Sequence, residues 1–309
     1  MKMIALKIDV DTLRGTKEGV PQLQSLLLKH RAGATFLFSL GPDHTGRAIK
    51  RVFRKGFLGK VQRTSVLEHY GLKTLLYGTL LPGPDIGTRA VGPMKATAAA
   101  GFEVGIHTWD HVAWQDHVVH APADWTERQM GLAESRFQAI FGHPARVHGA
   151  AGWQMNDAAF RHLDQAGMQW ASDTRGTGPF VPVIAGHACR CPQLPTTLPT
   201  LDELIGLDGL DATNVARHLL GLTEAPPPHG HVFTLHAELE GMRLSPVLDT
   251  LLSGWVQQGY QLVSLSDLGR TLQPGSLPHC PVVMGTIPGR SGTLAVQGAP
   301  LPESQFSKR

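Results

Sequence analysis

The sequence is poor in charged residues, cysteines and long apolar segments. Charged side chains make up 17% of the 309 residues and aromatic side chains 6%, whereas an average soluble domain has about 25% charged residues. No stretch approaches the roughly 18 consecutive apolar residues of a membrane-spanning helix. Lys2, Lys7 and Asp9 interrupt the N-terminal segment before the apolar core of a signal peptide could form. We therefore expect a protein that is neither secreted nor membrane-spanning.

The few cysteines give no sign of a disulfide framework. Cys189, Cys191 and Cys280 are odd in number, and one residue separates the first two, so the two-residue gap of a zinc knuckle or redox pair is absent. We interpret all three as reduced thiols of a cytosolic protein. The net charge of +3 is too small to indicate a nucleic-acid partner, and we expect none.

Hydrophobic residues, at 42%, are numerous enough for a sizeable core, and the length suits one large α/β domain. Short apolar segments with the composition of strands alternate with segments of helical periodicity. The expected strands are 3–8, 34–39, 102–106, 147–151, 169–172, 232–236 and 261–265. The expected helices include 22–30, 125–141, 157–166, 213–222 and 247–258.

Four predicted helices run into a glycine before the next strand, at Gly33, Gly101, Gly167 and Gly259. A left-handed glycine commonly ends a helix in this way. The repeated order of strand, helix, glycine and strand implies parallel strands joined by crossover helices, so the fold class is α/β, open or closed into a barrel.

Two boundaries divide the chain further. We expect a main domain over 1–273, with an insertion at about 42–90. The Pro- and Gly-rich tail, 274–309, has no helical or strand period, so we expect it to lie over the surface or to be disordered.

Two pairs of chemically active residues follow predicted strands, where α/β folds place catalytic groups. Asp9 and Asp11 are two residues apart, so their carboxylates share one side if the chain stays extended. The alternative is a solvated carboxylate pair. His107 and His111 have the spacing that places two imidazoles on one face of a helical turn, close enough to share a metal ion. With 16 histidines in the chain, such a spacing also arises by chance.

Three further segments lie at the ends of predicted strands or just after them. His236 is a candidate general acid or an ordinary residue at a strand end. Asp173 could hold the tautomer of a nearby histidine and raise its pKa. The segment 149–153 (Gly-Ala-Ala-Gly-Trp) has small residues whose backbone N–H groups could approach a substrate. Each signal is weak alone, but five of them in order at successive strand ends indicate one site.

In their order, these motifs resemble the polysaccharide deacetylases with a NodB-like domain. The resemblance covers residues 7 to about 268. It is carried by Asp-Val-Asp-Thr at 9–12, His-Thr-Trp-Asp-His at 107–111, Gly-Ala-Ala-Gly-Trp at 149–153, Ser-Asp-Thr-Arg-Gly at 172–176 and Leu-His-Ala-Glu at 235–238. It implies a distorted (β/α) barrel of about seven strands and hydrolysis of an amide on a carbohydrate.

The resemblance also implies a metal centre. Asp11, His107 and His111 would bind one divalent metal ion, and Asp9 would act as general base. Two imidazoles and one carboxylate suit zinc, cobalt, manganese or nickel, so the identity of the metal stays open.

The remaining roles follow from the same resemblance. His236 would be the general acid, supported by Asp173, and backbone N–H groups near Ala151 or Gly152, beside Trp153, would stabilise the oxyanion. Many members of the family orient the base with an arginine in the third motif. That arginine is absent here, and Arg175 is the candidate substitute.

Within the family, the segments 9–16 and 236–241 are similar to those of one branch. That branch removes the formyl group from 4-deoxy-4-formamido-L-arabinose phosphoundecaprenol in lipid A modification and polymyxin resistance. The similarity implies a sugar linked to undecaprenyl phosphate as substrate. The alternative is deacetylation of another N-acylated saccharide, and the lack of a signal peptide argues against a periplasmic one.

A basic stretch without acidic residues lies at 44–67, and its charge exceeds the net charge of the whole chain. Its apolar residues fall on one face of a helical period. The pattern favours docking on anionic lipid at the cytoplasmic side of the inner membrane. The alternatives are a packed helix with a solvated basic face and a non-enzymatic scaffold that binds membranes or nucleic acid. The expected lipid contacts are Arg47, Lys50, Arg51, Phe53, Arg54, Lys55 and Phe57.

Overall fold

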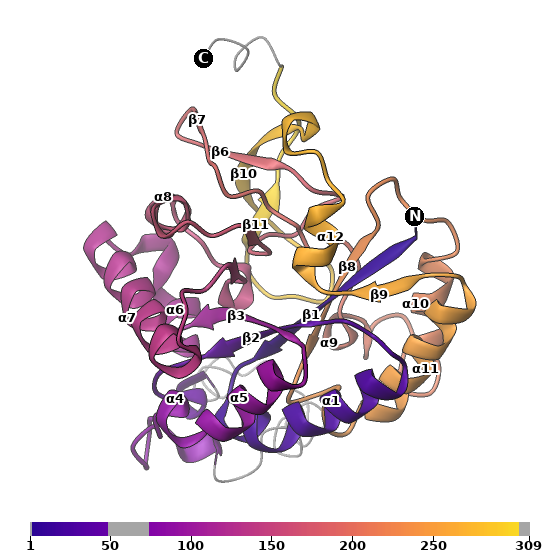
Figure 1. Cartoon of the computed structure of the whole chain (residues 1–309), viewed down its shortest axis with the longest axis horizontal. Helices are drawn as coiled ribbons and strands as arrows, with labels where there is room; N and C mark the ends of the chain where they lie inside the picture. Colours follow the sequence, from indigo (N-terminus) through magenta and orange to yellow (C-terminus); the bar gives the residue numbers. More distant parts are fainter. Residues whose placement is uncertain (1, 49–73, 303–309) are drawn as a thin grey trace.

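The computed structural model of the chain describes residues 2–48 and 74–302 (Figure 1). Its centre is a curled parallel sheet with the order β5-β4-β3-β2-β1-β8, in which β9 also pairs with β1. These strands are β1 (Met3–Val10), β2 (Thr35–Ser39), β3 (Glu103–Thr108), β4 (Val147–His148), β5 (Trp170–Ala171), β8 (His231–His236) and β9 (Gln261–Val263). Each overlaps a segment that the sequence predicts as a strand, so the α/β class and the distorted barrel of about seven strands are confirmed, and the sheet closes only half of that barrel.

Helices cover the outer face of the sheet (Figure 1). Every residue of β1 is buried, as is typical of a parallel strand with both faces covered. The covering helices pack side by side in the order α10, α11, α1, α5, α7 and α8. Their bounds are α10 (Val215–Leu222), α11 (Ser245–Gln257), α1 (Val20–Lys29), α5 (Val91–Ala99), α7 (Ala123–Phe141) and α8 (Asp157–Ala166).

An irregular segment, 192–198, spans the open side of the curled sheet between β5 and β8. The N–H of Leu194 donates to the carbonyl of Ala171 at 2.7 Å, and the N–H of Thr197 donates to the carbonyl of Val232 at 3.1 Å. These hydrogen bonds satisfy some of the backbone carbonyl groups at the outer edges of the two end strands. The half-barrel is thereby closed by loop rather than by strand.

Three of the four predicted helix-ending glycines have the left-handed conformation, with φ of 87° at Gly101, 69° at Gly167 and 84° at Gly259. The prediction is wrong after α1, where Arg31 takes the positive φ of 51°. Gly33 instead permits a close approach to the chain after β9, because a Cβ there would lie 3.2 Å from the backbone nitrogen of Ser264.

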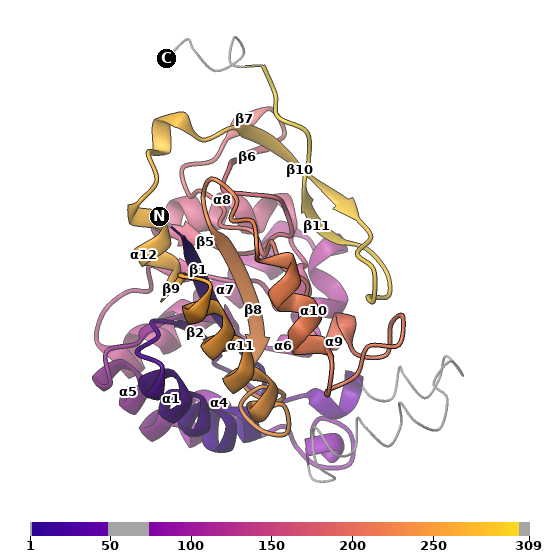
Figure 2. The same ribbon diagram turned by 90° about the vertical axis from the view of Figure 1, so that its right-hand side faces the viewer.

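The C-terminal segment differs from the irregular tail that we expected. A second sheet has the order β11-β10-β6-β7, and Figure 2 shows β10 and β11 at the end of the molecule opposite α1 and α5. Its strands are β6 (Val181–Ile184), β7 (His187–Ala188), β10 (His279–Gly285) and β11 (Leu294–Gln297). The first residues of β10 pair with β6, and the last residues pair with β11. Each part of β10 thus has one neighbouring strand, an arrangement that tolerates Pro281, which has no backbone N–H to donate. Whether 274–309 is a unit apart from 1–273 stays a prediction.

Short elements complete the described chain. The helices are α4 (Ile86–Arg89), α6 (His111–His117), α9 (Leu201–Leu204) and α12 (Leu265–Arg270). The element η1 (Gly15–Gly19) is a π-helical turn. The 3₁₀-helical turns are η2 (Thr74–Leu76), η3 (Val118–His120), η4 (Ala151–Trp153) and η5 (Pro274–Ser276).

The insertion is described only at its margins. Of the expected lipid contacts, Arg47 is described, and its Nε donates to the carbonyl of Gly78 at 3.0 Å. Lys50, Arg51, Phe53, Arg54, Lys55 and Phe57 lie outside the described residues. Within residues 2–48 and 74–302, no helix has the length and apolar character needed to cross a membrane.

Candidate active site

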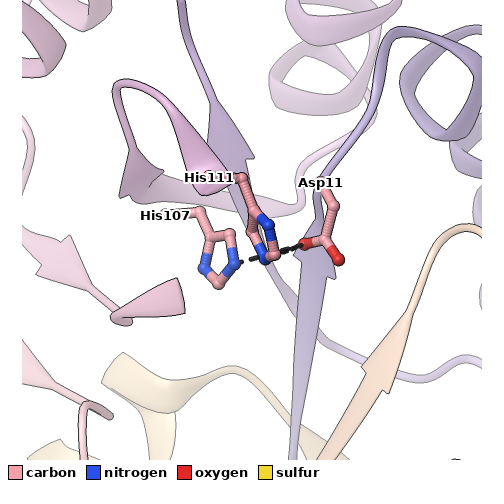
Figure 3. A group of neighbouring side chains, drawn as sticks. All are labelled: Asp11, His107 and His111. Atoms are coloured by element: carbon pink, nitrogen blue, oxygen red, sulfur yellow. Dashed lines mark ion pairs between the residues drawn. The ribbon is translucent and has the colours of Figure 1, made fainter. Parts of the chain in front are cut away.

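The predicted site residues gather where the parallel strands end. Asp9 on β1 is paired in register with His236 on β8, and Asp11 follows the last residue of β1. His107 is near the end of β3, and His111 begins α6 (Figure 3). The parallel register therefore places their side chains at one edge of the sheet, as the sequence predicts.

Three side chains converge on one point (Figure 3). Oδ1 of Asp11 lies 3.2 Å from Nε2 of His107 and 3.5 Å from Nε2 of His111, and the three donor atoms fit within 4.8 Å. The expected single helical turn is wrong, because His107 belongs to a strand and His111 to a helix that Asp110 caps with its side chain. The two rings nevertheless stack with centroids 5.3 Å apart, since a short turn reverses the chain between them.

The donor set fits a divalent cation. Nδ1 of His107 is 2.6 Å from the carbonyl oxygen of Gly149, an acceptor, so Nδ1 carries the proton and Nε2 keeps a lone pair. That Nε2 and Oδ1 of Asp11 are buried without a hydrogen-bond partner. Buried polar atoms are normally satisfied, and a metal ion would satisfy both.

The electrostatics favour the charge states that a metal needs. Burial alone would raise the pKa of Asp11, but the imidazoles of His111 and His107 outweigh it and hold that pKa below its usual value. Burial lowers the pKa of His111, although the carboxylate of Asp11 opposes the shift. An ionised carboxylate beside a neutral imidazole is the form in which both residues coordinate metals.

Glu238 fixes the backbone at Asp11. Its Oε1 accepts hydrogen bonds from the N–H of Thr12 at 2.9 Å, the Oγ1 of Thr12 at 2.7 Å and the N–H of Asp11 at 3.2 Å. Burial, together with the nearby Asp11 carboxylate, raises the pKa of Glu238 to about 8. Gly15 makes room for this carboxylate, because a Cβ there would lie 1.9 Å from Oε1.

Asp9, the predicted base, is buried with one oxygen committed and one free. Oδ2 accepts a hydrogen bond from Nζ of Lys7 at 2.8 Å, and Oδ1 has no hydrogen-bond partner. Arg175, the candidate substitute for the absent arginine, does not make this contact. Its guanidinium pairs with Glu203 and donates to the carbonyl of Thr196 at 3.3 Å.

Sequence reasoning missed Lys7. The available signal is a lysine in an otherwise apolar strand, two residues before Asp9 and therefore on the same face.

The expected support of His236 by Asp173 is also wrong. Asp173 follows β5, at the other end of the sheet from β8. Its Oδ1 is 2.7 Å from Nδ1 of His148 and accepts the N–H of Ala150 at 2.8 Å, while Oδ2 accepts from Nε2 of Gln193 at 3.0 Å. Asp173 thus holds the chain that leads into the small-residue loop.

Asp202 and Glu240 surround His236 instead. Nδ1 of His236 lies 4.0 Å from Oδ1 of Asp202, and the N–H of His236 donates to Oε2 of Glu240 at 2.7 Å. Burial alone would lower the pKa of His236, but Asp202 and the other nearby carboxylates outweigh it, so the pKa lies above its usual value. Burial raises the pKa of Glu240 to about 7. These surroundings favour a protonated His236.

The small-residue loop forms η4 directly after β4. Gly152 has φ of 61°, a left-handed conformation that suits glycine, and the buried Trp153 has φ of 52°. The indole ring of Trp153 lies 4.9 Å from Nζ of Lys7 and 4.4 Å from the guanidinium of Arg290. Both distances are typical of cation–π contacts.

Arg290 brings the C-terminal segment to the site. It lies between β10 and β11 and pairs with Asp202 at 3.2 Å and Glu203 at 2.6 Å. Sequence reasoning missed it, because the loop reaches α9 through strand pairing between distant segments, including that of β10 with β6.

Comparisons with known proteins identify the family. No family model matches the sequence. A protein of Shewanella sediminis (strain HAW-EB3) is 35% identical over 266 residues, which cover 86% of this chain and 85% of the relative. A protein of Wigglesworthia glossinidia brevipalpis is 31% identical over 290 residues, 92% and 98% of the two chains. Both are named "Probable 4-deoxy-4-formamido-L-arabinose-phosphoundecaprenol deformylase ArnD".

Solved structures share the fold. The "putative polysaccharide deacetylase" of Mycobacterium smegmatis has a TM-score of 0.61 at 13% identity, covering 93% of this chain and 96% of its own. The Xyl-CE4 domain of a xylanase from the hindgut metagenome of Trinervitermes trinervoides has a TM-score of 0.51 at 12% identity, with coverages of 88% and 93%. The chain therefore belongs to the family of the 4-deoxy-4-formamido-L-arabinose-phosphoundecaprenol deformylases, shares the fold of polysaccharide deacetylases and is a carbohydrate amide hydrolase.

Proposed function

We propose that this protein removes the formyl group from 4-deoxy-4-formamido-L-arabinose linked to undecaprenyl phosphate, giving formate and the 4-amino sugar lipid. The observation that carries the proposal is the convergence of Asp11, His107 and His111 beside the free oxygen of Asp9. The names of the two relatives supply the substrate. In this proposal the product serves lipid A modification and polymyxin resistance.

The chain supplies a base, an acid and hydrogen-bond donors for this hydrolysis. Asp9 accepts the proton of the attacking water through its free Oδ1. N–H groups near Ala151 or Gly152 in η4 hydrogen-bond the formyl oxygen as it gains negative charge. His236 then donates a proton to the sugar nitrogen as the C–N bond breaks, so that the leaving group departs as a neutral amine.

A divalent metal held by Asp11, His107 and His111 would polarise the formyl carbonyl and lower the pKa of the water. The two-histidine, one-carboxylate set leaves zinc, cobalt, manganese and nickel as candidates.

The substrate class is tested with water-soluble sugar phosphates that carry either a formamido or an acetamido group at C4. The proposal expects formate release, measured by a coupled formate dehydrogenase assay, to exceed acetate release at equal substrate concentration. Faster acetate release would favour the alternative, deacetylation of another N-acylated saccharide.

Asp202→Asn should shift the pH dependence of the reaction. Catalysis needs protonated His236, so activity falls as pH rises through the pKa of that group. The carboxylate of Asp202 raises this pKa, and its removal should move the basic limb of the profile of kcat/KM to lower pH. Asp249→Asn is the matched control, because Asp249 pairs with Lys29 on the helical face and its side chain has a similar exposure, 36% against 37%. An unshifted basic limb in Asp202→Asn would contradict this account of His236.

We further propose that the enzyme acts at the cytoplasmic face of the inner membrane, where a polyprenyl-linked substrate resides. The basic stretch at 44–67 supports this proposal, because each basic residue near an anionic bilayer contributes about 1 kcal/mol. Replacing Arg51, Arg54 and Lys55 by Glu should therefore reduce co-sedimentation with phosphatidylglycerol vesicles steeply, while hydrolysis of a soluble substrate persists.

A matched control makes the same change in net charge elsewhere. Lys95, Arg128 and Arg217 are exposed on α5, α7 and α10, and their replacement by Glu should leave sedimentation nearly unchanged. Equal losses in both triple variants would show a general charge effect and no docking surface at 44–67.

A further inference from the structure

Asp9 needs a defined orientation to act as a base, and one side chain supplies it. We propose that Lys7 is the positioning residue of Asp9, an inference that rests on the proposed role of Asp9 in amide hydrolysis. Nζ of Lys7 donates to Oδ2 of Asp9 at 2.8 Å, and the exposed fractions of the two side chains are 0% and 4%. A buried charge is normally paired, so each of these two groups requires the other.

The hydrogen bond decides which oxygen of Asp9 is left for chemistry. Lys7 occupies Oδ2, while Oδ1 has no hydrogen-bond partner and lies 3.7 Å from Nδ1 of His107. The free oxygen therefore faces the side of the metal ligands. Without Lys7, rotation of the carboxylate could exchange the two oxygens and misplace the acceptor.

The surroundings hold the ammonium of Lys7 in place. Lys7 and Asp9 are two residues apart on a fully buried strand, so both side chains lie on the same face of the sheet. The indole of Trp153 lies 4.9 Å from Nζ, an arrangement that stabilises a desolvated cation. Gly149 leaves the space for the lysine stem, because a Cβ there would lie 2.7 Å from Cε of Lys7.

Neighbouring cations are committed to other carboxylates. Arg175 and Arg290 also contact the ring of Trp153, but both pair with Glu203, and Arg290 pairs with Asp202 as well. Lys7 differs from both in that its Nζ donates a hydrogen bond to the carboxylate of Asp9.

The test compares Lys7→Met and Lys7→Arg with the wild-type enzyme and with Lys2→Met. Lys2 is a control at the start of the same strand region, where its Nζ lies over Tyr260 at 5.7 Å. Lys7→Met should lower kcat by about 10²-fold, the effect expected when a catalytic group is misplaced by about 1 Å. KM should change by less than about threefold, since Lys7 acts on Asp9 and not on substrate binding. The kcat of Lys7→Arg should be at least tenfold higher than that of Lys7→Met, because arginine returns a cation to Asp9.

Two further readouts separate positioning from a merely structural role. Metal content after dialysis should be the same in Lys7→Met and wild type, because Lys7 contacts no metal ligand in the described structure. In an Asp9→Asn background, Lys7→Met should lower the residual rate by less than about twofold, since Lys7 acts through a base that is already gone. A further loss as large as in the wild-type background, or a kcat for Lys7→Met within threefold of wild type, would overturn the proposal.

Thermal unfolding keeps the test independent of the proposed function. Lys7→Met and Asp9→Asn should each lower Tm, because each leaves a buried charge unpaired, and the double variant should lower it by less than the two shifts together. Strict additivity would overturn the pairing. If the wild-type enzyme released no formate while the two shifts proved non-additive, the proposed function would fail and the Lys7–Asp9 pairing would stand without its catalytic consequence.

Discussion

His107→Ala is expected to abolish both metal binding and activity. The imidazole is buried, its Nδ1 bonds the carbonyl of Gly149, and its Nε2 is directed toward Asp11 without another partner. Its loss removes one of three protein donors, so the remaining two should not retain a divalent ion through dialysis. We expect the metal content to fall to background and kcat/KM to fall by at least about 10³-fold, since the polarisation of the carbonyl disappears with the metal.

Elemental analysis after dialysis and formate release measure the two effects. His162→Ala is the matched control, because His162 is a partly buried histidine that pairs with Glu134 at 2.9 Å on the helical layer. Full metal occupancy in His107→Ala, or equal loss of metal in His162→Ala, would contradict the assignment of the ligands.

Asp9→Asn should separate proton transfer from metal binding. The amide has the shape of the carboxylate but cannot accept the proton of water, so kcat should fall by about 10²- to 10⁴-fold. The metal content should stay at the wild-type level, because the three ligand atoms lie on Asp11, His107 and His111. Single-turnover rates and elemental analysis on the same preparation give both values.

Two results for Asp9→Asn would contradict the role of Asp9 as general base. Loss of metal in Asp9→Asn would place Asp9 among the ligands, and a kcat near that of wild type would assign the proton transfer to another group. Either result would require a different base.

Much of the fold could be predicted because parallel strands buried on both faces are short apolar segments with clear ends. Asp9, Asp11, His107 and His236 could be placed for a related reason. A polar residue in the last positions of such a strand, or just past it, lies at the edge where parallel strands end. Their position at one edge follows from the parallel direction of the strands, which the strand and helix pattern implies.

The partners of these residues could not be predicted, because they depend on packing between distant segments. Asp173 pairs with His148, two residues before Ala150 on the neighbouring strand end, and only the sheet register reveals this choice. Arg290 lies in the loop between β10 and β11 and pairs with Asp202. Pro and Gly residues in this part of the chain obscure the sequence pattern of the two strands. The sequence does show Lys7 as a lysine within an apolar strand. It does not show where the ammonium of Lys7 points, because that depends on the space at Gly149.

Mass spectrometry of the lipid substrate tests the central claim most directly. The enzyme is incubated with 4-deoxy-4-formamido-L-arabinose phosphoundecaprenol, untreated, after chelation, and after addition of zinc, cobalt, manganese or nickel to the chelated protein. The account predicts that the lipid loses the mass of one CO group in the untreated sample, keeps it after chelation, and loses it again with at least one of the metals. Loss of that mass at an unchanged rate in chelated protein with no detectable metal would contradict metal-dependent deformylation.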